Sequence, residues 1–82
     1  MSVTHPGKIL KEKFVLPLIN QGQTLSQIST NSGIDLKIFL SLMLEKQSIT
    51  ESLAILLSNY FGTTSHYWVN LQSDFDSKIN FP

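Results

Sequence analysis

The hydrophobic positions along the chain fall into stretches with helical spacing, separated by glycine, proline or polar residues. Apolar residues that recur every three to four positions predict helices with one buried face. No stretch shows the strict alternation of apolar and polar residues that is typical of half-buried strands. The pattern therefore predicts an all-α chain of five helices.

The first predicted helix begins near Pro6, after a short N-terminal arm formed by residues 1–5. Proline suits the first turn of a helix, because the N–H that it lacks would have no partner there. The apolar stripe of this helix consists of Ile9, Leu10 and Phe14. Pro17 is expected to end or kink the helix, because proline removes a hydrogen bond inside one.

Residues 24–44 have the layout of a helix-turn-helix motif, two short helices joined by a tight turn. Thr24 and Gln27 match the capping box that begins many helices. Gly33 can adopt a left-handed turn at little cost, and Asp35 offers a side-chain oxygen to cap the second helix. The inward face of that second helix is expected to consist of Phe39, Leu42 and Met43.

Two further helices are predicted in the C-terminal half. Thr50 is expected to cap the fourth helix, and Gly62 to end it. Five consecutive apolar residues, 53–57, predict that this helix is buried on most sides. The fifth helix is expected to follow residues 63–65, and residues 77–82 to fray from its end. Its apolar stripe consists of Tyr67, Trp68, Leu71, Phe75 and Ile79.

The composition predicts one small domain over residues 1–82, with 41% hydrophobic and 15% charged residues. The chain has no cysteine, which excludes disulfides, thiolate metal sites and thiol nucleophiles. No charged segment precedes an apolar run at the N-terminus, and no apolar stretch approaches the length of a membrane span. We therefore expect a cytoplasmic protein without membrane contacts.

Catalytic and metal-binding patterns are not apparent in the sequence. His5 and His66 are the only histidines, and neither has further ligands at helical or turn spacing. Asp74 and Asp76 would point about 200° apart on a helix, which does not suit a catalytic acid/base pair. The sequence predicts that the protein is not an enzyme and uses no metal, cofactor or small-molecule substrate.

Five short motifs are spread over residues 4–76 of the chain. They are His5-Pro6-Gly7-x-Ile9-Leu10, the turn Gly33-Ile34, Ile49-Thr50, Phe61-Gly62-Thr63 and Trp68-Val69-Asn70-Leu71-Gln72. Together they resemble the HigA-type antitoxins, which belong to the Xre/Cro-like helix-turn-helix superfamily. A lone helix-turn-helix would be weak evidence, whereas the opening and closing motifs in one chain are much more specific.

The resemblance implies a five-helix bundle of the lambda-repressor/Xre-like type that homodimerises through its C-terminal region, about residues 63–76. It also implies that the protein neutralises a RelE-like, mRNA-cutting toxin and represses its own operon by placing the second helix of the motif in the major groove of DNA. The dimer contacts are then expected from Tyr67, Trp68, Leu71 and Phe75. The DNA contacts are expected from Lys37 and Ser41, with Gln27 and Lys46 at phosphates.

The outward face of the predicted recognition helix departs from this family. Leu36, Leu40 and Leu44 recur at every fourth position, where the family has mostly polar residues. Leucine cannot hydrogen-bond to base edges, although it can contact a thymine methyl group. Across residues 23–49, two lysines and two acidic residues give a net charge of 2 − 2 = 0, and the chain has no arginine. Both features weaken the expected affinity for operator DNA.

Further departures lie at the two turns of the motif. Ser29 and Ser32 stand where the family usually has apolar residues, and Ser29 is close in size to the usual alanine. Glu45 replaces the glycine that usually follows the recognition helix. The turn after that helix is therefore expected to differ.

Two functions remain open from the sequence. The first is an antitoxin and regulator that binds a toxin and its operator. The second is a degenerate helix-turn-helix protein without DNA binding, which contacts a protein through Leu36, Leu40 and Leu44. These leucines could instead be covered by the first helix or the arm. The lysines of the first helix are interpreted as its solvated face; they are Lys8, Lys11 and Lys13.

Overall fold

The computed structural model describes residues 4–79, which form five helices and no strand. The first helix runs through three consecutive segments, α1 (Pro6–Ile9), a π-helical stretch η1 (Leu10–Val15) and α2 (Leu16–Asn20). It is followed by α3 (Leu25–Ser32), α4 (Leu36–Met43), α5 (Glu51–Phe61) and α6 (Ser65–Ile79). The predicted all-α class is confirmed. The expected fraying of residues 77–82 is not seen up to residue 79, and residues 1–3 and 80–82 lie outside the described residues.

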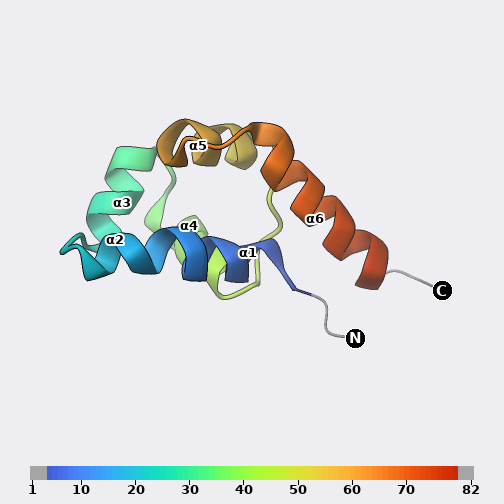
Figure 1. The fold of residues 1–82 in the computed structure, drawn as a ribbon, viewed down its shortest axis with the longest axis horizontal. Helices are drawn as coiled ribbons and strands as arrows, with labels where there is room; N and C mark the ends of the chain where they lie inside the picture. The colour runs from blue at the N-terminus through green and yellow to red at the C-terminus, as the bar shows by residue number, and fades with distance from the viewer. Residues whose placement is uncertain (1–3, 80–82) are drawn as a thin grey trace.

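The first helix lies along one long side of the molecule, with α5 opposite and α6 running along one end (Figure 1). Segment α1 packs against both α4 and α6, and α3 packs against α4 and α5. The beginning of α1 and the end of α6 therefore lie at the same end of the molecule (Figure 1). The largest fully buried side chains come from every helix and include Leu10, Ile28, Phe39, Leu57 and Trp68.

The first helix continues through Pro17, where the sequence predicted an end or a kink. In the π-helical stretch before it, the N–H of Leu16 donates to the carbonyl of Lys11, five residues earlier. This wider turn shifts the hydrogen-bonding register and places Pro17 in the first turn of α2, where the missing N–H is tolerated. The helix does not end at Pro17, because the preceding turn adapts to the proline, and the alternative of a kink stays a prediction.

The motif His5-Pro6-Gly7 fastens the start of the first helix to the rest of the molecule. The Nδ1 atom of His5 accepts a hydrogen bond from the N–H of Gly7 at 2.9 Å, which caps the helix. A Cβ atom added to Gly7 would lie 1.7 Å from the carbonyl oxygen of Leu42, so only glycine allows α1 to approach α4 this closely. His5 is 4% exposed, and its ring packs edge-on against Phe75 of α6. The expectation that His5 belongs to a free arm was therefore wrong.

Helix α5 is less enclosed than its run of apolar residues predicted. Leu53, Ala54 and Leu57 are buried, but Ile55 is 49% exposed. The partners of α5 are α3 and α6, and they leave one side of it open. None of the described helices is long and apolar enough to cross a membrane.

The buried position of His5 predicts a pH-dependent stability. Burial lowers the pKa of His5 from its usual 6.5, and the carboxylates of Glu45 and Asp76 oppose this shift. The unfolded chain therefore binds the proton first as the pH falls. The free energy of unfolding should be highest above pH 6.5 and decrease as the pH falls toward the lowered pKa.

Urea denaturation from pH 7.5 to 5 would measure this dependence. His5→Asn keeps a cap acceptor but cannot titrate, so it should remove this part of the pH dependence. At pH 7.5 it should cost about 1 kcal/mol, because the ring contact with Phe75 is lost. An identical slope in the variant and the natural protein would assign the dependence to another group.

Candidate nucleic-acid interface

Helix α3 begins with the complete capping box that the sequence predicted. The Oγ1 atom of Thr24 accepts a hydrogen bond from the N–H of Gln27 at 3.2 Å, and the Oε1 atom of Gln27 accepts one from the N–H of Thr24 at 2.9 Å. The helix ends at Gly33, whose φ of 79° lies in the left-handed region. Both ends of the first helix of the motif are thus set by local hydrogen bonds and backbone freedom.

Two buried serines hold the turn between α3 and α4. The hydroxyl of Ser29 donates to the carbonyl of Ile34, and the hydroxyl of Ser32 accepts from the N–H of Ile34 at 3.3 Å. Ser32 also donates to the carbonyl of Ser29 at 3.2 Å. Ser29 is therefore more than a substitute for alanine, and the signal for these bonds is that serine and threonine often bond to nearby backbone groups in turns. The two hydroxyls fix the angle at which α4 leaves the turn.

Helix α4 has the predicted cap and the predicted inward face. The Oδ2 atom of Asp35 accepts a hydrogen bond from the N–H of Lys37 at 3.0 Å. Phe39, Leu42 and Met43 are buried in the core. The opposite side of α4 is consequently the side that a DNA groove could meet.

The four residues predicted to contact DNA come from α3, from α4 and from the turn that follows α4. Lys37 is exposed and Ser41 half-buried, and they stand one helical turn apart on the same side of α4. Gln27 is exposed at the start of α3, and the carboxamide nitrogen of its side chain takes no part in the capping box. Lys46 is exposed just beyond the end of α4. Whether they contact DNA stays a prediction.

The row Leu36, Leu40 and Leu44 does not form the uniform face that either sequence interpretation required. Leu36 is half-buried, Leu40 is half-buried against the core, and Leu44 is 64% exposed. A step of four residues turns about 400° around a helix, so each leucine lies about 40° further from the core than the last. The row therefore moves outward along α4, and Leu44 alone of the three is fully on the surface.

No protein-family model matches the chain. An addiction-module antidote protein of the HigA family from Coxiella burnetii is 32% identical and superposes with a TM-score of 0.84. The match covers 96% of this chain and 83% of that protein. This chain belongs to the HigA family of antitoxins. The resemblance inferred from the five sequence motifs is confirmed.

Two further proteins extend this comparison. A Pseudomonas aeruginosa protein solved in complex with 18 base pairs of its operator DNA is 26% identical, with a TM-score of 0.85 over 99% of this chain and 84% of that one. Virulence-associated protein I of Dichelobacter nodosus is 29% identical over 79 residues, which are 96% of this chain and 70% of the relative. The structural neighbours are antitoxins and DNA-binding proteins, and not enzymes, as predicted for this HigA-type chain.

The turn after α4 keeps the left-handed geometry although Glu45 stands where HigA proteins usually have glycine. Glu45 has a φ of 63°, and it is the one non-glycine residue with positive φ among residues 4–79. Its N–H donates to the carbonyl of Leu42 at 3.1 Å, and the N–H of Lys46 donates to the carbonyl of Ser41 at 2.9 Å. These two bonds form the Schellman motif that ends many helices. Glu45 thus adopts the left-handed conformation that glycine takes most easily, and a difference from the turn of other HigA proteins stays a prediction.

The side chains predicted for the HigA-type dimer contact lie largely within the protomer. Trp68 is fully buried, with its Nε1 atom 2.7 Å from Thr63 Oγ1 and its ring packed on Phe14. Tyr67 also packs against Phe14 but is 37% exposed. Leu71 and Phe75 are half-buried. Trp68 thus has no surface to offer a second copy, because the first helix covers it.

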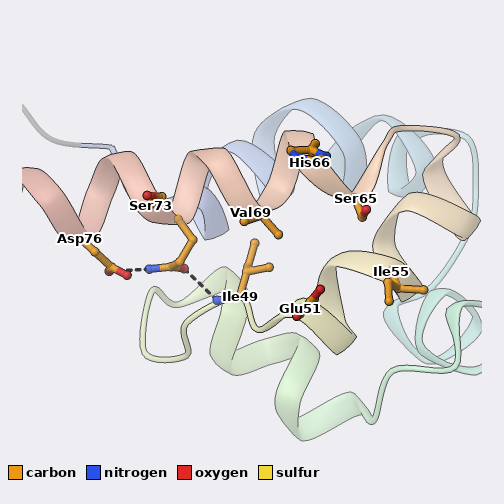
Figure 2. Close-up of a pocket in the computed structure, with 9 residues that line it drawn as sticks. Ile49, Glu51, Ile55, Ser65, His66, Val69, Ser73 and Asp76 are labelled. Carbon is orange, nitrogen blue, oxygen red and sulfur yellow. Dashed lines mark hydrogen bonds between the residues drawn. The ribbon is translucent and has the colours of Figure 1, made fainter.

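An open groove of about 470 Å³ lies between the start of α5 and the side of α6 opposite Trp68 (Figure 2). Ile49, Ile55 and Val69 supply its apolar surface, and the carboxylates of Glu51 and Asp76 lie beside it. Nothing in the sequence indicated this surface, because a run of five apolar residues in α5 is typical of a buried helix. No three histidine, aspartate or glutamate side chains of residues 4–79 come together in a way that could hold a metal ion.

The wall of the groove is tied to the loop that follows the recognition helix. The Oε1 atom of Gln72 accepts a hydrogen bond from the N–H of Ile49 at 2.8 Å, and its Nε2 atom donates to the Oδ1 atom of Asp76 at 2.9 Å (Figure 2). Gln72 is buried, so these bonds are shielded from water. Helix α6 and the end of the motif are thereby held in a fixed relation.

The conformation of Glu45 predicts that glycine would be more stable at this position. The left-handed conformation costs a residue with a side chain about 1–2 kcal/mol, and glycine avoids this cost. Glycine is also more flexible in the unfolded chain, which lowers the free energy of unfolding by about 0.5–1 kcal/mol and offsets part of the gain. Glu45→Gly should therefore raise the free energy of unfolding by about 0.5–1 kcal/mol in urea denaturation. Lys46→Gly is the matched control and should lower it, because Lys46 does not have a positive φ. A loss of stability in Glu45→Gly would show that the carboxylate makes a compensating contact.

Proposed function

We propose that this HigA-family chain is an antitoxin that represses its own operon by placing α4 in the major groove of operator DNA. The observation that carries this proposal is the rigid presentation of α4, which has a side-chain cap at one end and a Schellman turn at the other. A similar fold bound to its operator in Pseudomonas aeruginosa supports it. Lys37 and Ser41 on the outer side would face the bases, with Gln27 and Lys46 at phosphates.

The electrostatic part of this binding should be small. Lys37 and Lys46 are the only basic residues across residues 23–49, and the chain as a whole has zero net charge. Each phosphate neutralised by lysine contributes about −0.9 to the slope of log K against log salt concentration. Lys46 is the one lysine placed at a phosphate, so a dimer that neutralises one phosphate per protomer would have a slope of about −1.8, which is shallow for a repressor.

This slope gives the first test of operator binding. Fluorescence anisotropy with the DNA upstream of the gene should show sub-micromolar binding that random DNA does not compete away. Lys46→Ala should weaken binding and reduce the slope by about 1.8 per dimer. Lys13→Ala removes the same charge from the exposed side of the first helix and should leave both quantities unchanged. Equal effects of the two substitutions, or no sequence preference in the natural protein, would refute operator binding through α4.

A second candidate function is a protein-binding module without DNA contacts. It is favoured by the 64% exposure of Leu44 and by the absence of arginine. It is weakened by the half-buried state of Leu36 and Leu40, which reduces the apolar area available to a partner. Loss of a partner complex in Leu44→Glu, with no operator binding by the natural protein, would favour this second function.

We propose in addition that the chain neutralises a RelE-like toxin, as expected from its membership of an antitoxin family. Co-expression with a RelE-like protein encoded beside it provides the test. The antitoxin should relieve the growth arrest that the toxin causes, and the two should purify as one complex. Persistent arrest together with separate elution of the two proteins would count against this part of the proposal.

Dimerisation is proposed to use the C-terminal region, about residues 63–76, within a single domain over residues 1–82. The apolar surface that the protomer leaves open there is the groove between α5 and α6, where Ile55 is 49% and Val69 37% exposed. A second copy in this groove would lie next to the loop that ends the motif, because Gln72 bonds to Ile49. Repressors of this class bind two half-sites about 34–36 Å apart, which requires such a linked pair of motifs.

Substitution of Ile55 tests this dimer surface. Ile55→Glu would bury a charge in the interface at a cost of roughly 2 kcal/mol, about thirtyfold in the dimer Kd, while the exposed position lets the fold survive. Sedimentation equilibrium should then report a monomer. Leu16→Glu changes a side chain that is 42% exposed on the first helix and should remain dimeric. Dissociation of Leu16→Glu, with Ile55→Glu still dimeric, would place the interface on the first helix instead.

A further inference from the structure

The outer side of the recognition helix carries one strongly exposed apolar side chain in a fixed position. Leu44 is 64% exposed, more than any other large hydrophobic residue among those described. Its N–H donates to the carbonyl of Leu40 at 2.9 Å, and the following residue, Glu45, is held in the left-handed turn. Leu44 is therefore held rigidly at the end of α4 with most of its side chain in water.

Few groups on this side can hydrogen-bond to base edges. Helix α4 contains no arginine, asparagine or glutamine, which are the residues that form paired hydrogen bonds with guanine or adenine. The carboxylate of Asp35 already accepts the N–H of Lys37. Lys37 and Ser41 remain as polar groups, and neither can distinguish all four base pairs. Sequence discrimination by α4 therefore has to include an apolar component.

The major groove offers one apolar group, the 5-methyl group of thymine. Leu36, Leu40 and Leu44 follow one another at a rise of about 6 Å, close to the separation of about 7 Å between base pairs two steps apart. Lys37 near the start of the row is offset by Asp35, and Lys46 beyond its end by Glu45, so the row itself carries no net charge.

We propose that the recognition helix identifies its operator by apolar contact with thymine methyl groups, with Leu44 as the main contact. Leu36 and Leu40 would contribute less, because they are half-buried. The proposal rests on the operator binding proposed above and names the chemical group that α4 recognises. The bound half-sites must then contain thymines in the segment that α4 covers.

Replacing thymine by uracil in the half-sites tests this directly, because uracil keeps the hydrogen-bonding edge and lacks only the methyl group. Anisotropy titrations would compare the two duplexes at the same salt concentration. Burial of one methyl group corresponds to about three- to fourfold in Kd, so the uracil duplex should bind at least that much more weakly. Leu44→Ala should bind the thymine duplex more weakly and lose most of the difference between the two duplexes.

The matched control is Ile38→Ala, which removes an apolar side chain that is 39% exposed on the same helix but about 120° around it from Leu44. This variant should keep the full difference between thymine and uracil. Equal binding of the two duplexes by the natural protein would overturn the inference and leave operator binding intact. Absence of specific binding to either duplex would overturn operator binding itself, and the inference with it. An unchanged difference in Leu44→Ala would assign the methyl contacts to another residue.

Discussion

The close approach of the first helix to the recognition helix is the contact on which the rest of the structure depends. Gly7 lies so near the backbone of Leu42 that any side chain there would collide with its carbonyl oxygen. His5 caps the same end of the helix and packs against Phe75, which joins α6 to this contact. Helix α4 has only eight residues and could not persist alone in water. It is ordered because it packs against α1 and α3 and because both of its ends are capped by hydrogen bonds.

The recognition helix combines a rigid frame with an unusual surface. Its cap, its turn and its C-terminal Schellman motif are all complete, and the hydroxyls of Ser29 and Ser32 bind the turn to α3. Its outer side, however, carries little charge and ends in an exposed leucine. A surface of this kind releases few counterions on binding DNA, so burial of apolar area has to supply more of the affinity.

The last helix divides the molecule into a closed side and an open side. On the closed side, Trp68 packs against Phe14 of the first helix and donates to Thr63. On the open side, Val69 faces a groove that it shares with Ile55 of α5 (Figure 2). The aromatic residues of α6 thus stabilise the protomer, and smaller aliphatic residues are left for assembly. Because Gln72 connects this helix to Ile49, an assembly on the open side would act on the orientation of the motif.

The sequence by itself determined the features that depend on neighbouring residues. The capping box of Thr24, the turn at Gly33 and the cap at Asp35 are formed by hydrogen bonds or backbone freedom within a few positions, so their residue types suffice to predict them. The helical periodicity also determined the inward face of α4. The tertiary structure alone decided the burial of His5 and the exposure of Ile55, because both depend on which distant helix covers them. A helical pattern specifies which residues share a face, whereas the packed neighbours determine whether that face meets protein or water.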